Sequence, residues 1–227
     1  MSEIRNNVPF DPYYFEKQLK QQKTYSLTET FEQIYESKHW NGAESVSGEG
    51  AGLDQTRQLK KNLPEITSAL KIRTFLDLPC GDFSWMNTID LPVEKYIGGD
   101  IVAQIVEKNR QEYGNPQREF KIIDITKDDL PAADLILCRD CFVHLSFQDI
   151  KSALENIKQS TAKYLLTTTF NGCEVNENIV TGDWRVLNLE KPPFSLPKPI
   201  QMIDEKCTEG RGAFADKFLG LWKVKDL

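Results

Sequence analysis

A short apolar run that ends beside an acidic residue and then breaks into a tight turn constrains this chain more than any other feature. The run spans residues 72–78 and carries Asp77, and the turn after it contains Pro79 and Gly81. A strand, a tight turn and a helix N-terminus in this order are how a doubly wound α/β domain begins a nucleotide-binding site. The segment therefore predicts an open, mostly parallel sheet with a ligand site beyond the carboxyl ends of its strands.

The rest of the chain supports this α/β prediction, because strand-like and helix-like segments alternate from residue 72 onward. The expected strands are 72–78, 95–100, 119–124, 134–139 and 164–170, and the expected helices are 84–88, 102–113 and 147–159, the last capped by Ser146. Several of the strands are almost continuously apolar, which is typical of strands buried on both faces of a parallel sheet. After residue 170, two further strand-like runs, 200–207 and 217–224, predict a closing antiparallel hairpin.

The first 70 residues carry helix signals and lack the alternation of strands and helices. Asp11 and Pro12 predict the start of a short helix, and the capping box Ser26-x-x-Glu29 predicts a second one. A third helix is expected over 55–62, where Pro64 would interrupt it. We therefore expect residues 1–70 to form a helical cover with a lid-like loop, and residues 71–227 to form the main domain.

Composition restricts the classes of function. A chain of 227 residues suits one α/β domain, and its net charge of −6 argues against a general affinity for nucleic acid. No apolar stretch approaches the roughly 18 residues of a membrane helix, and residues 1–7 lack the apolar core of a secretory signal. Five cysteines without a disulfide-framework spacing favour reduced thiols and a cytoplasmic protein. The oligomeric state stays open.

Acidic residues stand at the ends of three successive expected strands: Asp77, Asp100 and Asp124. Together they resemble the cofactor site of the class I methyltransferases that use S-adenosylmethionine. The resemblance implies a seven-stranded sheet with one antiparallel strand, and residues 71–227 as the catalytic domain. It also implies S-adenosylmethionine as cofactor and S-adenosylhomocysteine as product. In such a site Asp77 would hold the donor's amino group, Asp100 the ribose hydroxyls, and Asp124 the adenine amino group while Ile125 packs against the ring. The expected cofactor contacts are Asp77, Pro79, Cys80, Gly81, Trp85, Asp100, Ile101, Asp124, Ile125 and Arg139.

The turn departs from the family's acid-x-Gly-x-Gly-x-Gly motif, since it reads Asp77-Leu-Pro79-Cys-Gly81-Asp-Phe83 and keeps only the middle glycine. Phe83 would narrow the turn, and Asp82 would place a negative charge where a dinucleotide enzyme holds a pyrophosphate. Three alternatives remain: an NAD-dependent oxidoreductase, a non-catalytic module that binds an adenosyl ligand, and an unrelated α/β protein in which the three acids only cap helices.

The segment after the fourth strand offers catalytic candidates. His144 is one of two histidines and suits a general base, or else a histidine that packs structurally. Asp140 with His144 is similar to the metal site of some methyltransferases, but the further Glu and His ligands lack counterparts, so we expect no metal. Cys138 and Cys141 are better explained as small buried side chains than as a redox or zinc pair.

Two further segments are candidates for contacting the acceptor. The first contains Trp40, Ser45, Ser47 and Gly48 and is either a lid that excludes water or a solvated linker. The second is the pair Trp184-Arg185, which suits an anionic or sugar-like acceptor or else a surface salt bridge over a packed tryptophan. Arg211 is a weaker cationic candidate.

The layout is also similar to small bacterial methyltransferases of capsule and other surface-glycan pathways. We expect a small polar or anionic acceptor, such as a sugar, a phosphorylated metabolite or a surface-glycan precursor. Its nucleophile is expected to be an oxygen, with a nitrogen as the alternative. The expected catalytic residues are His144, Asp140 and Arg185.

Overall fold

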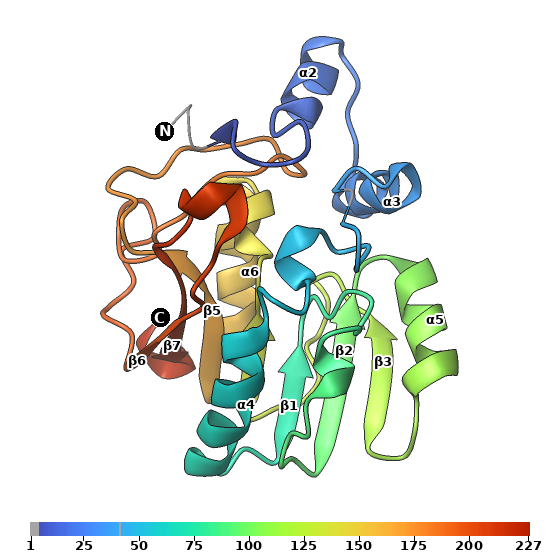
Figure 1. Cartoon of the computed structure of the whole chain (residues 1–227), viewed down its shortest axis with the longest axis vertical. Coiled ribbons are helices and arrows are strands. Elements are labelled where there is room, and N and C mark those ends of the chain that lie inside the picture. The colour runs from blue at the N-terminus through green and yellow to red at the C-terminus, as the bar shows by residue number, and fades with distance from the viewer. Residues whose placement is uncertain (1–4, 41) are drawn as a thin grey trace.

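A seven-stranded sheet forms the centre of the molecule in the computed structural model, which describes residues 5–40 and 42–227 (Figure 1). Its strands are β1 Thr74–Asp77, β2 Lys95–Asp100, β3 Arg118–Ile122, β4 Leu135–Cys138, β5 Tyr164–Phe170, β6 Gln201–Asp204 and β7 Lys217–Lys223. Their spatial order is β3-β2-β1-β4-β5-β7-β6. Strands β1 to β5 pair in parallel, whereas β7 runs antiparallel to both of its neighbours. The predicted doubly wound sheet with an antiparallel C-terminal hairpin is confirmed.

Five α-helices and five short 3-10 helices surround the sheet within the described residues. The α-helices are α2 Tyr14–Lys20, α3 Leu27–Ser37, α4 Arg57–Ala69, α5 Ala103–Tyr113 and α6 Phe147–Gln159. The 3-10 helices are η1 Glu49–Ala51, η2 Met86–Thr88, η3 Phe142–His144, η4 Glu209–Gly212 and η5 Val224–Asp226. Across residues 5–40 and 42–227, none of the helices is long and apolar enough to cross a membrane.

The capping signals were correct for two helices. The Ser26 hydroxyl accepts from the backbone N–H of Glu29, and the Glu29 carboxylate accepts from the N–H of Ser26 at 2.7 Å. Ser146 caps α6 by accepting from the backbone N–H of Asp149. In both cases a side chain satisfies N–H groups that a helix start leaves without partners, so the boundary can be read from the sequence.

Three helix predictions were wrong in detail. Helix α4 runs through Pro64 to Ala69 instead of ending near residue 62, because the apolar face it buries outweighs the hydrogen bond that proline removes. The expected helix over 84–88 is only the single 3-10 turn η2. Helix α2 begins at Tyr14 rather than at Pro12. Asp11 accepts from the N–H groups of Tyr13 and Tyr14, and the distant carboxylate of Asp183 accepts from the next two N–H groups of the helix.

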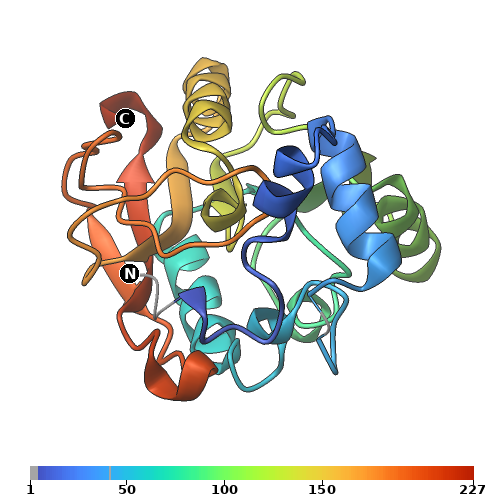
Figure 2. The same cartoon turned by 90° about the horizontal axis from the view of Figure 1, so that it is seen from above.

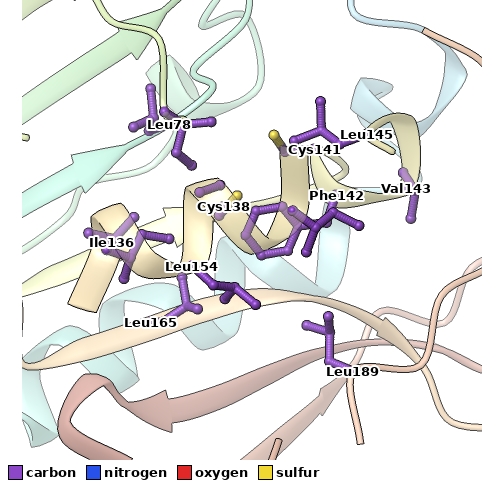
Figure 3. Packing of buried hydrophobic residues seen from close by; sticks show 14 of the residues in the cluster. Leu78, Ile136, Cys138, Cys141, Phe142, Val143, Leu145, Leu154, Leu165 and Leu189 are labelled. Atoms are coloured by element: carbon purple, nitrogen blue, oxygen red, sulfur yellow. The ribbon is translucent and has the colours of Figure 1, made fainter. Parts of the chain in front are cut away.

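Two apolar clusters lie on the two faces of the sheet. Adjacent strand residues alternate between them: Phe75 and Leu135 belong to the cluster with α4, whereas Leu76 and Ile136 belong to the cluster with α6. Figure 3 shows part of the second cluster, where strand residues such as Cys138 pack with α6 and the segment after β5. Burial on both faces accounts for the continuous apolar runs of these strands.

The N-terminal helices α2 and α3 lie at the carboxyl ends of the parallel strands, whereas α4 packs against the sheet as part of its core (Figures 1 and 2). Leu59 and Leu63 of α4 are fully buried. The division of the chain at residue 70 stays a prediction. Residues 1–4 lie outside the described residues. They belong to the N-terminal segment whose composition disfavours a secretory signal.

Candidate functional site

A deep cleft opens between the carboxyl ends of β1, β2 and β4 and the N-terminal cover. It encloses about 1130 Å³, the part open to solvent included. Helix α3 contributes Leu27, Phe31 and Ile34 to its lining, and Figure 2 shows this helix on the side of the molecule where the parallel strands end. The residues that line it are Leu27, Phe31, Ile34, Tyr35, Trp40, Val46, Ser47, Ala51, Asp77, Leu78, Pro79, Cys80, Gly81, Asp82, Trp85, Asp100, Ile101, Val102, Ile105, Ile123, Ile125, Arg139, Asp140, Cys141, His144 and Leu145.

Hydrogen bonds fix the backbone of the turn that follows β1. Gly81 has a φ of 53° and donates its N–H to the Asp100 carboxylate at 3.1 Å. Its carbonyl accepts from the Asn109 side chain at 2.7 Å. A Cβ at this position would collide with the Ser47 hydroxyl, so a side chain here would require Ser47 to move. Phe83 does not narrow the turn as expected: it is buried among Tyr96, Tyr113 and Phe120, outside the cleft lining.

Two of the predicted acids line the cleft and are almost fully buried. Asp77 accepts from the Tyr96 hydroxyl at 2.6 Å, and Asp100 accepts from the N–H groups of Gly81 and Val102. Burial raises the pKa of Asp77 to about 7 and that of Asp100 to about 6, against the lowering effect of these hydrogen bonds. Both carboxylates would therefore gain from a cation that enters the cleft.

The third acid has a different environment. Asp124 is buried but does not line the cleft; its carboxylate accepts from Thr126 and pairs with Lys127 at 3.1 Å. The contact of Asp124 with the donor stays a prediction; the cleft wall beside it is apolar, and Ile101, Ile123 and Ile125 form it. The acid stabilises the turn that presents this wall.

A chain of alternating charges lies at the junction of β4, β6 and β7. The guanidinium of Arg139 contacts the Glu205 carboxylate at 2.7 Å, the Asp140 carboxylate at 3.2 Å and the carbonyl of Gly50 at 2.8 Å. Lys217 contacts Asp140 at 2.7 Å. Burial opposes ionisation of Asp140, but the two cations outweigh it and hold the pKa of that carboxyl well below its usual range. Arg139 and Lys217 are thus already neutralised by carboxylates.

His144 stands beside this cluster in a defined protonation state. Its Nδ1 lies 3.1 Å from the carbonyl oxygen of Asp183. A carbonyl only accepts, so Nδ1 carries the proton and Nε2 keeps its lone pair. Burial lowers the pKa of His144 to about 4 although Asp140 raises it, so the ring is neutral at physiological pH. The Trp40 ring packs against the imidazole with 4.5 Å between ring centroids.

A second, smaller cavity adjoins the cleft and encloses about 610 Å³. Trp40, Ser47, Asp140 and His144 line both cavities and therefore mark their junction. The remaining lining residues are Asn7, Val8, Pro9, Phe10, Gly48, Glu49, Gly50, Phe170, Trp184, Glu209, Gly210, Phe214 and Lys217. Two ligands bound in the two cavities would meet at this junction.

The predicted lid residues divide between cavity wall and support. Trp40, Ser47 and Gly48 line cavities, whereas Ser45 is buried and accepts from the N–H of Ser47. The loop is tied to the turn after β1 because the N–H of Val46 donates to the Asp82 carboxylate at 3.1 Å. Position 41 lies outside the described residues. Within the part described, the segment has the contacts of a cover rather than those of a free linker.

The structure separates the Trp184-Arg185 pair. Trp184 lines the second cavity, whereas Arg185 lines neither cavity. The buried guanidinium of Arg185 donates to the carbonyls of Phe142, Leu145 and Glu177 at 2.7, 2.8 and 3.1 Å. The expected acceptor contact from Arg185 is therefore corrected to a structural role. Arg211 lines neither cavity and is exposed in η4.

The segment around Arg185 positions His144. Arg185 binds the carbonyls of Phe142 and Leu145 on either side of the histidine, and its own N–H donates to the carbonyl of Val143 at 3.1 Å. The N–H of Gly182 donates to the carbonyl of His144 at 2.8 Å, and Asp183 fixes the imidazole. Thus η3 is held from one side by a single loop.

Sequence reasoning missed two groups of cavity residues. Leu27, Phe31 and Ile34 of α3 line the cleft, and the capping box with its apolar face was the available signal. Lys217 and Phe214 reach the second cavity from the C-terminal hairpin, and nothing in the local sequence connects that hairpin to the end of β4. All five cysteines are free and buried, with Cys138 and Cys141 in the core. No group of residues able to hold a metal ion occurs in the described part of the chain.

Comparison with known proteins identifies the fold. No family model matches the chain, and none of the curated proteins does. Among solved structures, the N-methyltransferase NodS from Bradyrhizobium japonicum WM9 with S-adenosyl-L-homocysteine superposes with a TM-score of 0.58. The two are 11% identical, and the match covers 84% of this chain and 97% of that chain.

Human N-acetylserotonin methyltransferase with bound S-adenosylmethionine gives a TM-score of 0.56 at 17% identity, covering 88% of this chain but 60% of that longer one. The methyltransferase domain of bacterial CtHen1 gives 0.55 at 12% identity, covering 76% of this chain and 98% of that domain. Together with the observed strand order, these similarities show that the chain has the fold of the class I methyltransferases.

Proposed function

We propose that this protein is an S-adenosylmethionine-dependent methyltransferase that methylates a small polar molecule. The observation that carries the proposal is a pair of adjoining cavities that share four lining residues. One holds the buried carboxylates Asp77 and Asp100 at the strand ends of a methyltransferase fold, and the other meets it at Asp140 and His144. A donor and an acceptor need such adjoining spaces, whereas a protein that only binds an adenosyl ligand needs one.

The cleft fits S-adenosylmethionine better than a dinucleotide. The two buried carboxylates have raised pKa values because burial disfavours their charged forms, and a cationic amino group or sulfonium would offset that cost. An apolar wall of Ile101, Ile123 and Ile125 suits an adenine ring. A pyrophosphate instead needs free backbone N–H groups and a nearby cation. The N–H of Gly81 is already bonded to Asp100, and Arg139 is already paired.

S-adenosylmethionine, when bound, supplies a methyl group activated by its sulfonium. The residues of this chain would hold it through Asp77, Asp100 and the isoleucine wall. Trp40 and the α3 face cover the cleft and exclude water, and the fixed cavity junction orients the acceptor, an effect worth roughly 7–11 kcal/mol where orientation is good. His144 Nε2 has a lone pair to accept the proton of an acceptor hydroxyl, which would contribute about 10²–10⁴-fold.

The expected nucleophile is an oxygen of a small molecule such as a sugar or a surface-glycan precursor. The charges near the second cavity support the polar acceptor over the phosphorylated one. Lys217 is surrounded by the carboxylates of Asp140, Glu205 and Glu209 within 3.8 Å, so it offers no net positive charge to a phosphate. We further propose a cytoplasmic location, which the five free cysteines support.

Thermal unfolding in the presence of separate ligands tests the proposal. We expect S-adenosylmethionine and S-adenosylhomocysteine to raise the unfolding temperature and NAD to leave it unchanged. Asp100→Ala should abolish the rise, whereas Asp54→Ala, which removes an exposed carboxylate paired with Arg57, should preserve it. Stabilisation by NAD, or by none of the three, would contradict the proposal.

A further inference from the structure

The second cavity combines aromatic walls with carboxylates. Phe10 and Trp40 approach it from the N-terminal segment, and Phe170, Trp184 and Phe214 from the main domain. The last three pack edge-on, with 5.0 Å between the ring centroids of Trp184 and Phe214. Their mutual packing fixes the wall before any ligand arrives. Aromatic faces carry a negative quadrupole and attract cations as well as apolar surface.

The charged groups at this cavity have an acidic excess. Within the described residues, the cluster contains the cations Arg139 and Lys217 and the carboxylates Asp140, Glu205 and Glu209. Glu49 adds a further carboxylate to the lining. In addition, one oxygen of the buried Glu205 has no hydrogen-bond donor among the described residues. The cluster therefore holds more carboxylate than its own cations neutralise.

Glu209 is the carboxylate best placed to face a ligand. Its side chain lines the second cavity, is about one-fifth exposed and lies 3.6 Å from Lys217, farther than the 2.7 Å contact of Lys217 with Asp140. Its remaining contact of note is a weak one from the Cys207 thiol at 3.4 Å. Glu209 thus retains acceptor capacity toward the cavity, next to the Phe214 wall.

From these observations we infer that the second cavity binds the cationic amino group of the acceptor molecule, between the Glu209 carboxylate and the aromatic walls. The inference rests on the proposed function and specifies its acceptor as a small ammonium-bearing molecule. The ammonium is a binding handle; the hydroxyl to be methylated lies on the same molecule, at the junction with the cleft. Phosphate-bearing molecules are rejected by the acidic excess.

Three probes with one phenyl group and different charges test the inference: benzylamine, benzyl alcohol and benzyl phosphate. Their binding is followed by ligand-observed NMR and by the intrinsic fluorescence of the four tryptophans, of which Trp40 and Trp184 line the second cavity. Both measurements are made with and without S-adenosylhomocysteine. We expect benzylamine to bind about tenfold more tightly than benzyl alcohol, with a preference that falls as salt rises, and benzyl phosphate not to bind.

Glu209→Gln keeps the size of the side chain and removes its charge, so the preference for benzylamine should fall to about twofold. Glu155→Gln is the matched control, because it makes the same change on the exposed face of α6 and should leave the preference intact. Both variants are checked for an unchanged unfolding temperature.

The outcomes separate the two proposals. If benzyl alcohol binds as tightly as benzylamine, if benzyl phosphate binds best, or if Glu209→Gln keeps the full preference, the inference is overturned while the methyltransferase proposal stands. If S-adenosylhomocysteine does not bind at all, the proposed function fails, whatever the probes show.

Discussion

Replacing Arg185 by methionine removes a buried guanidinium but keeps most of the side chain's length. In the wild-type protein this group donates to three carbonyls, those of Phe142, Leu145 and Glu177. It forms no ion pair with a carboxylate within the described residues. Burial therefore lowers the pKa of Arg185 to about 9. The substitution tests whether this arginine positions His144 or contacts the acceptor itself.

The expected effect on stability follows from two opposing contributions. Hydrogen bonds to a charged group are worth about 1.5–3 kcal/mol each, so three of them are worth roughly 6 kcal/mol. Removing a buried charge that lacks a carboxylate partner stabilises the folded state by several kcal/mol, because that state no longer contains a charge without its water. We expect Arg185→Met to lower the free energy of unfolding by about 2–3 kcal/mol.

Urea unfolding followed by tryptophan fluorescence measures this difference. Arg73→Met is the matched control: it breaks an exposed ion pair with Glu94, which water and salt screen, and it should leave the free energy of unfolding almost unchanged. In the folded variant at low temperature, misplacement of His144 should lower kcat more than it raises the KM for the acceptor. Unchanged stability together with a raised acceptor KM would refute this account and restore a direct acceptor contact.

Three further predictions concern the cleft. Because Asp77 binds a proton more tightly in the folded protein (pKa about 7) than in the unfolded chain (about 3.9), the folded state holds more protons between these pH values; its stability should fall as pH rises from about 4 to 7. Asp77→Asn should flatten this part of the pH dependence of the unfolding temperature. It should also abolish the increase in S-adenosylmethionine affinity that is expected as Asp77 ionises. An unaltered dependence of the unfolding temperature on pH would contradict the raised pKa. His144→Ala should lower kcat for a hydroxyl acceptor by about 10²–10⁴-fold. The wild-type rate should not change through titration of His144 between pH 5.5 and 8, since the pKa of His144 is about 4. Retained activity of the variant in steady-state kinetics would exclude His144 as the base. Gly81→Ala should destabilise the protein by about 1–2 kcal/mol, because alanine is strained at φ 53°, and should weaken S-adenosylhomocysteine binding in calorimetry by displacing Ser47; normal affinity would show that the Ser47 loop does not cover the donor.

The sheet could be predicted because its information is local. Each parallel strand is a short apolar run, and Asp77 and Asp100 mark the points where two of them end. Strand residues that alternate between two buried faces leave a continuous apolar pattern, as in β4. Carboxyl ends of parallel strands meet at one edge, so the position of the cleft followed from the strand order.

What could not be predicted depends on contacts between distant segments. The start of α2 depends on Asp183, about 170 residues away in the chain, whose carboxylate accepts from Phe15 and Glu16 in addition to the local contacts from Asp11. The continuation of α4 through Pro64 depends on its burial against the sheet. The role of Arg185 depends on three backbone carbonyls, which leave no pattern in the sequence.

The second cavity was beyond sequence reasoning for the same reason. Its walls combine the N-terminal segment, the end of β4, the loop after β5 and the C-terminal hairpin. Several of its residues, such as Trp40, His144 and Trp184, were single candidates, but nothing in the sequence showed that they share one cavity. The acidic excess there depends on which carboxylates surround Lys217, and the net charge of −6 does not indicate that arrangement.

A crystal structure of the protein grown with S-adenosylhomocysteine tests the central claim most directly. The account predicts density for the ligand in the cleft, with its amino group at Asp77, its ribose at Asp100 and its adenine against the wall of Ile101, Ile123 and Ile125. The ligand should not extend into the second cavity, which meets the cleft at Asp140 and His144. A ligand bound elsewhere, or a cleft without density at saturating ligand concentration, would contradict the account.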